Sequence, residues 1–349
     1  MPNFHSLVIS EIKQETPNAV SIELEIPQEL AKTFQFKAGQ YITFKHTIRD
    51  TEVRRAYSIC CAPGDETIRV GVKKVKDGTF SVFANDELKV GDTLAVMPPE
   101  GNFVFEPNVS NQNTYAAFAA GSGITPVLSI IKDALEREPQ SNFVLVYGNQ
   151  SQAETMFHEE LESLKDRYND RFKIEYIYSR TKEYNAMQGR IDRSVVNYLL
   201  KNKYAETEFE TFYLCGPEVM IQTVTETLEE RGVSKDVILF ELFTSSEDGS
   251  LTEVHEGNTK VTVTLDDETD SFVMSQKKCV LDAALDHGLD APFSCQGGIC
   301  STCIARVTKG EVEMRKNQIL TDSELAEGLI LACQAHPTTA ELVIDFDDV

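Results

Sequence analysis

Four cysteines near the carboxyl end of the chain have the spacing of an iron–sulfur site. Cys295, Cys300 and Cys303 form a C-x4-C-x2-C run, and Cys333 follows farther along the chain. Four thiolates in this arrangement can hold two irons bridged by sulfide, as in plant-type [2Fe-2S] centres. A four-cysteine zinc site is the alternative, but zinc sites favour paired C-x2-C spacing. The spacing therefore predicts a [2Fe-2S] cluster.

The remaining cysteines do not continue this pattern. Cys60 and Cys61 are adjacent, while Cys215 and Cys279 stand alone. Buried cysteines commonly act as small apolar residues, and we interpret Cys60, Cys61 and Cys279 in this way. Cys279 precedes a predicted helix and is not expected to be a fifth ligand.

A second group of residues combines a cation, an aromatic ring and a hydroxyl. Arg55, Tyr57 and Ser58 stand at the end of a predicted strand, and Gly78 and Ser81 follow the next strand. Such groups suit a pyrophosphate and a flat ring system. A solvated strand end is the alternative interpretation of this short motif.

A glycine-rich loop opens a predicted helix after the apolar segment YAAFAA. Gly121 and Gly123 allow close approach of a phosphate, and Thr125 and Pro126 begin the helix. The unpaired N–H groups of a helix N-terminus also favour an anion. An ordinary strand-to-helix turn is the competing interpretation.

Residues after the segment FKIEYIY indicate the choice of coenzyme. Ser179 and Arg180 end this predicted strand, and Arg190 follows ten residues later. A hydroxyl and two guanidinium groups suit the 2'-phosphate of NADPH, whereas a carboxylate would favour NADH. Glu183 lies nearby and keeps NADH open as the alternative.

The elements that carry these residues divide the chain into three predicted domains and a linker. Short strands dominate residues 1–107, with little helical periodicity, and predict a small antiparallel β-barrel. Strands alternate with amphipathic helices in residues 108–244, which predicts an α/β domain with a parallel sheet. The acidic residues 245–258 contain no Lys or Arg and predict a linker, and residues 259–349 form a third domain that begins with a hairpin and a helix ending at Gly288.

Charge and hydropathy exclude several classes of function. The chain of 349 residues has a formal net charge of -23, which disfavours binding to nucleic acids. It contains no apolar stretch long enough to span a bilayer, and its first residues do not resemble a targeting signal. We therefore expect a cytoplasmic protein without a membrane span.

Residues 1–243 resemble the ferredoxin-NADP reductase superfamily, and the third domain resembles plant-type ferredoxins, which have an α+β (β-grasp) fold. The shared segments are RAYS, GTFS, GSGITP and CGP in the first part and FSCQGGICSTC in the last. This resemblance implies FAD, with Arg55 at its pyrophosphate, Tyr57 on its ring and Ser58 near flavin N5. Gly78 and Ser81 would support the pyrophosphate, while FMN remains an alternative because some relatives carry it.

The same resemblance implies roles for residues around the nicotinamide. Cys215 would lie beside the carbon that releases hydride and would position it, while Gly216 and Pro217 would shape its approach. Glu241 would lie near the nicotinamide, and Phe243 would shield the flavin ring.

The order of the three predicted sites forms an electron path. Hydride carries two electrons and a [2Fe-2S] cluster accepts one, so a flavin between them serves as a converter. The whole chain resembles reductase components of bacterial multicomponent oxygenases, most closely those of di-iron phenylacetyl-CoA epoxidases, which implies an external oxygenase as acceptor. Ketosteroid, alkane and aromatic-ring hydroxylases are alternative acceptors, and a redox-sensing interaction protein is an alternative of another class.

Overall fold

The computed structural model describes residues 4–243 and 257–349, and the chain divides into two compact units. The larger unit consists of His5–Val53 and Tyr57–Phe243, and the smaller one includes all described residues of the carboxyl-terminal part. Arg54–Ala56, in the middle of a strand of the larger unit, are grouped with the smaller unit by their contacts. Most of the predicted linker, residues 245–256, lies outside the described residues. Its last predicted residue, Asn258, already begins a strand.

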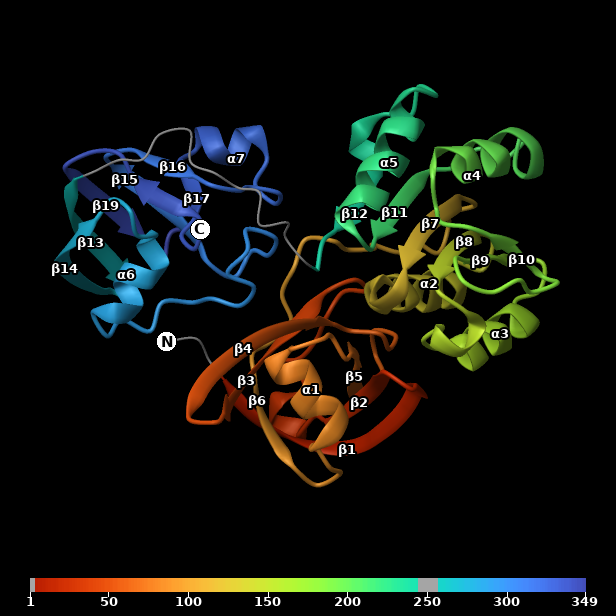
Figure 1. The fold of residues 1–349 in the computed structure, drawn as a ribbon, viewed down its shortest axis with the longest axis horizontal. Coiled ribbons are helices and arrows are strands. Elements are labelled where there is room, and N and C mark those ends of the chain that lie inside the picture. Colours follow the sequence, from red (N-terminus) through yellow and green to blue (C-terminus); the bar gives the residue numbers. More distant parts are fainter. Residues whose placement is uncertain (1–3, 244–256) are drawn as a thin grey trace. The chain divides into compact units, whose positions relative to one another are not determined.

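The larger unit begins with a six-stranded sheet in the order β4-β3-β6-β1-β2-β5, shown in Figure 1. The registers given for its neighbouring strands are antiparallel, as predicted. Alternating apolar side chains such as Leu7, Ile22 and Val70 are fully buried and form its core. The strands are β1 (His5–Thr16), β2 (Ala19–Glu25), β3 (Tyr41–Ile48), β4 (Thr51–Ser58), β5 (Thr67–Lys73) and β6 (Thr93–Val96).

Two local features of this sheet differ from the sequence prediction. One of the short strands predicted within residues 1–107 covers the segment AYSICCA, but β4 ends at Ser58 and only Ile59 continues it, by an isolated bridge to Val70. Residues between β5 and β6 form helix α1 (Thr79–Asp86), which was not predicted. Its buried residues Phe80 and Ala84 are four apart, but eight residues are too few to show a helical period clearly.

The second part of the larger unit is a parallel sheet in the order β10-β9-β8-β7-β11-β12. Figure 1 shows α2 and α3 on one side of this sheet and α4 and α5 on the other. The short edge strand β10 was not predicted. The elements are β7 (Thr114–Ala120), α2 (Ile124–Arg137), β8 (Asn142–Asn149), α3 (His158–Arg167), β9 (Phe172–Tyr178), β10 (Ala186–Gln188), α4 (Arg193–Tyr198), β11 (Thr211–Cys215), α5 (Glu218–Glu229) and β12 (Ile238–Glu241).

The order of these strands creates a switch point beside β7. The chain runs from β7 to β8 and β9 on one side, and then returns to place β11 on the other side. Ligands of open α/β sheets bind outside the carboxyl ends of the strands at such a point. The predicted phosphate loop after β7 and Cys215 at the end of β11 both lie there.

The smaller unit is an α+β domain with a five-stranded sheet in the order β14-β13-β19-β15-β17. The predicted hairpin and helix are confirmed, and Gly288 adopts a positive φ of 82° just after the helix. The elements are β13 (Asn258–Leu265), β14 (Glu268–Ser275), α6 (Val280–Asp286), β15 (Ile304–Lys309), β16 (Val312–Met314), α7 (Asp322–Ala326), β17 (Leu329–Leu331), β18 (Ala335–Pro337) and β19 (Glu341–Asp345). Over both described ranges, the chain has no helix whose length and apolar character would let it cross a membrane.

Gly39 and Gly91 lie in turns that precede β3 and β6, and substitutions at these two positions separate the effect of a close contact from that of backbone strain. Gly39 and Gly91 have φ values of 101° and 90°, but a Cβ on Gly39 would lie 1.9 Å from the Phe103 carbonyl oxygen, whereas Gly91 has open space. We expect Gly91→Ala to cost about 1–3 kcal/mol of strain, and Gly39→Ala to cost at least about 2 kcal/mol more. Thermal unfolding followed by circular dichroism measures this difference, and equal losses would contradict the predicted contact.

Candidate flavin, nicotinamide and iron–sulfur sites

Strand β4 carries the three residues of the predicted flavin motif. Arg55 is exposed, and its Nη1 atom donates to the Arg54 carbonyl oxygen. The half-buried ring of Tyr57 packs at centroid distances of 5.8 Å from Phe44 and 5.5 Å from Phe80. These contacts orient an aromatic ring that is still partly exposed, as a stacking partner of a flavin requires.

The loop that enters α1 fits a diphosphate. A Cβ on Gly78 would lie 2.3 Å from Ser81 Oγ, so only glycine fits here without a rearrangement. The buried Ser81 hydroxyl accepts a hydrogen bond of 3.3 Å from the Val75 N–H and thereby fixes this loop. The N-cap residue Gly78 has no side chain that could cap the first backbone N–H groups of α1, and such groups at a helix N-terminus favour an anion.

Ser58 at the end of β4 meets Glu241 at the end of β12. Ser58 Oγ donates a hydrogen bond of 2.9 Å to Glu241 Oε2, and both side chains are buried. Burial raises the pKa of Glu241 to about 8, so the carboxyl holds its proton at neutral pH. The structure therefore brings together two residues that the sequence prediction placed at the flavin and at the nicotinamide.

The loop after β7 has the form that a nucleotide diphosphate needs. Gly121 has a φ of 56°, and its carbonyl oxygen accepts a 2.9 Å hydrogen bond from the Tyr147 hydroxyl. A Cβ on Gly123 would lie 2.1 Å from the Cys215 carbonyl oxygen, so the loop can approach β11 only with glycine at this position. Thr125 Oγ1 donates to the Ser122 carbonyl oxygen at 3.0 Å, and Pro126 lies buried in the first turn of α2.

The end of β11 presents a buried thiol beside this loop. Cys215 is fully buried, and burial raises its pKa well above the ordinary value, which supports a positioning role and not a nucleophilic one. A Cβ on Gly216 would lie 2.8 Å from Met220 Cε, and Pro217 caps helix α5. Phe243 is half-buried and packs against the core of the parallel sheet.

The residues predicted to select the coenzyme lie at one edge of the same sheet. The backbone N–H of Ser179 donates to the Asn149 carbonyl oxygen, and that of Arg180 donates to Gln150, at 3.0 and 2.9 Å. The Gly189 N–H donates to the Tyr178 carbonyl oxygen, which places Arg190 beside the end of β9. Both arginine side chains are exposed.

Sequence reasoning missed some residues around the nucleotide loop. Lys73 Nζ lies 3.7 Å from the position of a Cβ on Gly121, although the two residues are far apart in the sequence. Its only signal was its place in the basic run KKVK after β5. A cavity of about 610 Å³ also lies near the Ser179–Arg180 edge; its lining includes Lys13, Thr155, His158, Thr181 and Glu183.

The four predicted cluster ligands lie in one region of the smaller unit. Cys300, Cys303 and Cys333 are buried, and Cys295 is partly exposed. The neighbouring thiols of Cys300 and Cys333, together with backbone N–H groups, lower the pKa of Cys295. Sulfur atoms that contact one another and accept hydrogen bonds are the donor set that an iron–sulfur cluster needs.

The loop between the first two cysteines folds as a cradle. Gly298 has a φ of 72°, and a Cβ there would lie 2.8 Å from the Lys316 carbonyl oxygen. The Gly297 N–H donates to Cys295 Sγ at 3.3 Å. Gln334 was not predicted, but its Nε2 atom lies 3.7 Å from Cys333 Sγ and donates to the Gln296 carbonyl oxygen at 3.0 Å. Only its place next to a ligand could have identified it.

Among the described residues, no group of three or more His, Cys, Asp or Glu side chains could hold one metal ion. A binuclear cluster has other requirements, because its four thiolates are distributed over two irons joined by sulfide. Cys279 stays outside this group: it caps α6, and its Sγ atom accepts a 3.5 Å hydrogen bond from the Asp282 N–H.

Comparisons with known proteins agree with this division of the chain. Residues 6–105 match the oxidoreductase FAD-binding domain, residues 118–226 the oxidoreductase NAD-binding domain and residues 263–338 the 2Fe-2S iron-sulfur cluster binding domain. The chain is 38% identical to one of the subunits of the 1,2-phenylacetyl-CoA epoxidase from Escherichia coli, with 99% of both chains covered. It belongs to the oxygenase-reductase family.

Another member of this family and a solved structure are also similar to this chain over nearly its whole length. The ferredoxin reductase component of the Rhodococcus rhodochrous 3-ketosteroid-9-alpha-monooxygenase is 33% identical over 97% of this chain and 96% of its own length. Phthalate dioxygenase reductase is 24% identical and has the same fold, with a TM-score of 0.61 and coverage of 99% of this chain and 98% of the other. The oxygenase reductase described here is thus an NAD(P)H-dependent oxidoreductase that uses FAD and a [2Fe-2S] cluster.

The buried Glu241 predicts a specific dependence of stability on pH. Its pKa of about 8 exceeds the ordinary value of 4.5, so between these values the folded protein binds more protons than the unfolded protein. Its contribution to stability is therefore present below about pH 4.5 and is lost as the pH rises toward 8, at no more than about 1.4 kcal/mol per pH unit.

Glu241→Gln removes this proton exchange and should flatten the pH dependence of unfolding. We expect the melting temperature of the flavin-containing unit to fall less in this variant than in the wild type between about pH 5.5 and 8. Glu87→Gln, at an exposed carboxyl group, is the control. An identical pH slope in all three proteins would refute a raised pKa at Glu241.

Substitution of two buried cysteines of the smaller unit, Cys303 and Cys279, tests which cysteines bind the cluster and which only pack in the core. Cys303→Ser should lose most of the bound iron and acid-labile sulfide, because serine is a poor replacement for a cluster thiolate. Cys279→Ser should retain both, since serine is also a good helix N-cap. Iron and sulfide analysis of the two purified variants checks this; equal iron content in both would contradict the assigned ligand set.

Proposed function

We propose that this oxygenase reductase takes hydride from NADPH beside the buried Ser58–Glu241 contact. It then delivers single electrons through the four-cysteine cluster to a di-iron oxygenase of the phenylacetyl-CoA epoxidase type. The buried Ser58–Glu241 hydrogen bond of 2.9 Å carries the first part of the proposal. The acceptor is proposed from the 38% identity to the Escherichia coli epoxidase component over 99% of both chains. Free cysteines throughout the described residues fit a reducing cytoplasm.

Each bound group has a set of residues that would hold it. Bound FAD supplies the conversion between a two-electron donor and a one-electron acceptor. Arg55 and the loop from Gly78 to Ser81 would bind its diphosphate, and Tyr57 would lie on its ring. Phe243, which packs against the core of the parallel sheet, would cover the ring.

The residues of the nicotinamide edge orient the coenzyme without adding charge. Gly121, Gly123 and Thr125 would bind the diphosphate at the N-terminus of α2. The thiol of Cys215 is neutral, and Glu241 holds a proton beside the Ser58 hydroxyl at neutral pH. A nicotinamide ring that enters here meets an uncharged edge that excludes water, because all three side chains are buried.

Cys295, Cys300, Cys303 and Cys333 would hold the cluster in the smaller unit. The backbone N–H of Gly297 points at the Cys295 sulfur, and the Gln334 amide lies beside the Cys333 sulfur. Such donors stabilise the negative charge that a cluster gains on reduction. These residues therefore suit a centre that accepts an electron and passes it on.

The proposed order of transfer predicts different losses for two artificial acceptors. Cys300→Ser should abolish the reduction of cytochrome c by NADPH, because this acceptor takes electrons from the cluster. Ferricyanide reduction should remain within about twofold of the wild type, because the flavin can supply it directly. Steady-state rates with both acceptors test the order; an equal loss of the two activities would exclude it.

The preference for NADPH is proposed from the half-buried Ser179 and the exposed Arg180 and Arg190 at one edge of the sheet. Arg180→Ala should lower kcat/KM for NADPH by about tenfold or more, since a charge-assisted contact with phosphate contributes about 1.5–3 kcal/mol. The value for NADH should change by less than about twofold. Arg167→Ala, in helix α3, is the control at an arginine outside this edge. An unchanged NADPH to NADH ratio in Arg180→Ala would show that Arg180 does not contact the 2'-phosphate.

A further inference from the structure

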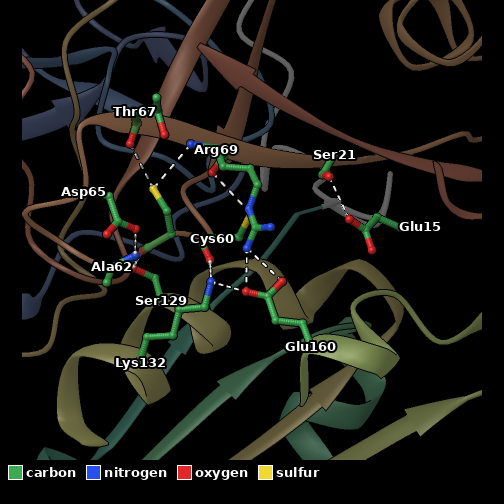
Figure 2. A network of polar contacts seen from close by, with 11 residues as sticks. Glu15, Ser21, Cys60, Ala62, Asp65, Thr67, Arg69, Ser129, Lys132 and Glu160 are labelled. Atoms are coloured by element: carbon green, nitrogen blue, oxygen red, sulfur yellow. Dashed lines mark hydrogen bonds and ion pairs between the residues drawn. The ribbon is translucent and has the colours of Figure 1, made fainter. Parts of the chain in front are cut away.

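A partly buried network of charged groups joins the antiparallel sheet to the helices of the parallel sheet (Figure 2). Arg69 of β5 contacts both carboxylate oxygens of Glu160 in α3, at 2.7 and 2.8 Å. Lys132 of α2 contacts the same carboxylate at 2.5 Å. The three side chains are only 14–23% exposed, so the contacts are largely shielded from solvent.

Two opposing effects set the pKa of Glu160. Burial alone would raise the pKa of Glu160, but the charges of Lys132 and Arg69 outweigh it and lower this pKa. The carboxylate is therefore ionised and shared by two cations. Because the desolvation of buried charges offsets most of their attraction, such networks contribute little net stability. A role in fixing geometry is the best-supported use of buried charges.

The same network reaches the segment that follows the flavin motif. Lys132 Nζ donates to the Cys60 carbonyl oxygen at 2.9 Å, and Ser129 Oγ donates to the Cys61 carbonyl oxygen at 2.7 Å. These carbonyl groups come two and three residues after Ser58. The Cys60 side chain belongs to the core of the parallel sheet, whereas the Cys61 side chain belongs to the core of the antiparallel sheet. The segment is thus the seam between the two cores.

Helix α2 connects this seam with the nucleotide loop. Its N-terminus carries Thr125, and Lys132 lies about two turns later, roughly 10 Å along the helix axis. Strand β5 also packs beneath the loop, since a Cβ on Gly71 would lie only 2.7 Å from Thr125 Cγ2. One rigid helix therefore holds the nucleotide loop at one end and the flavin segment along its length.

We propose that Lys132, together with Ser129 and Glu160, is a positioning residue that sets the register between the nucleotide loop and the Ser58 segment for hydride transfer. Reacting groups must be held to within a fraction of an ångström, and a displacement of about 1 Å by a distant mutation can cost about a hundredfold in rate. Without the Lys132 ammonium, the Cys60 carbonyl group and Glu160 both lose a partner. The Ser58 segment can then shift relative to α2 while both cores stay packed.

The test compares Lys132→Met with Lys203→Met in the full-length holoenzyme. Lys203 forms a similar ion pair, at 2.6 Å from Glu175, but both residues lie within the parallel-sheet domain. Anaerobic stopped-flow measurements give the limiting rate of flavin reduction and the apparent Kd for NADPH. We expect Lys132→Met to lower the limiting rate by about 10- to 100-fold, with the apparent Kd within about threefold and FAD still bound. Lys203→Met should retain both values, and Lys132→Arg should recover part of the rate.

A second variant and a second measurement separate positioning from folding. Ser129→Ala removes only the hydrogen bond to the Cys61 carbonyl oxygen and keeps all charges. Hydrogen exchange of the amides at residues 59–62 should increase in Ser129→Ala and Lys132→Met but not in Lys203→Met. If Lys132→Met does not fold, Ser129→Ala decides the question: a lower limiting rate with faster exchange supports the proposal. An unchanged limiting rate of flavin reduction in the folded variants overturns the proposal. A loss of this rate that only follows the melting temperature and the FAD content in every variant also overturns it.

Discussion

The close backbone approach of Gly123 to Cys215 is the constraint on which the larger unit depends. A single methyl group on Gly123 would lie 2.1 Å from the Cys215 carbonyl oxygen, so the loop after β7 can lie against the end of β11 only if this residue is glycine. This approach occurs at the point where the strand order reverses. It therefore brings a phosphate-binding helix N-terminus and a buried thiol to the same edge of the sheet.

The Ser58–Glu241 contact joins strand β4, which carries the flavin motif, to this edge of the parallel sheet. Its two residues are 183 positions apart, and each one ends a strand of a different sheet. The buried contact fixes how the end of β4 meets the end of β12. Burial of the Glu241 carboxyl raises its pKa to about 8 although the Ser58 hydrogen bond lowers it, so the carboxyl is protonated at neutral pH. In the cysteine loop of the smaller unit, a backbone N–H group donates a hydrogen bond to sulfur. Such hydrogen bonds stabilise the negative charge that is added on reduction.

Much of this organisation could be predicted from the sequence because its signals are local. The cysteine spacing, the GSGITP loop and the alternation of strands with amphipathic helices each lie within a short stretch of chain. Helix α1 and strand β10 were missed because eight and three residues carry too little periodicity. The Arg69–Glu160–Lys132 network could not be predicted, since Arg69 and Glu160 are 91 positions apart and each looks like an ordinary surface charge in the sequence. The shifted end of β4 likewise depends on its partner strands.

The central claim is that electrons from NAD(P)H reach the cluster only through the flavin. The most direct measurement compares holoenzyme with protein from which FAD has been removed, in an anaerobic titration followed by the electron paramagnetic resonance signal of the reduced cluster. The account predicts that NADPH produces this signal in the holoenzyme but not in the flavin-free protein, whereas dithionite produces it in both. A signal that NADPH generates equally well without flavin would contradict the account.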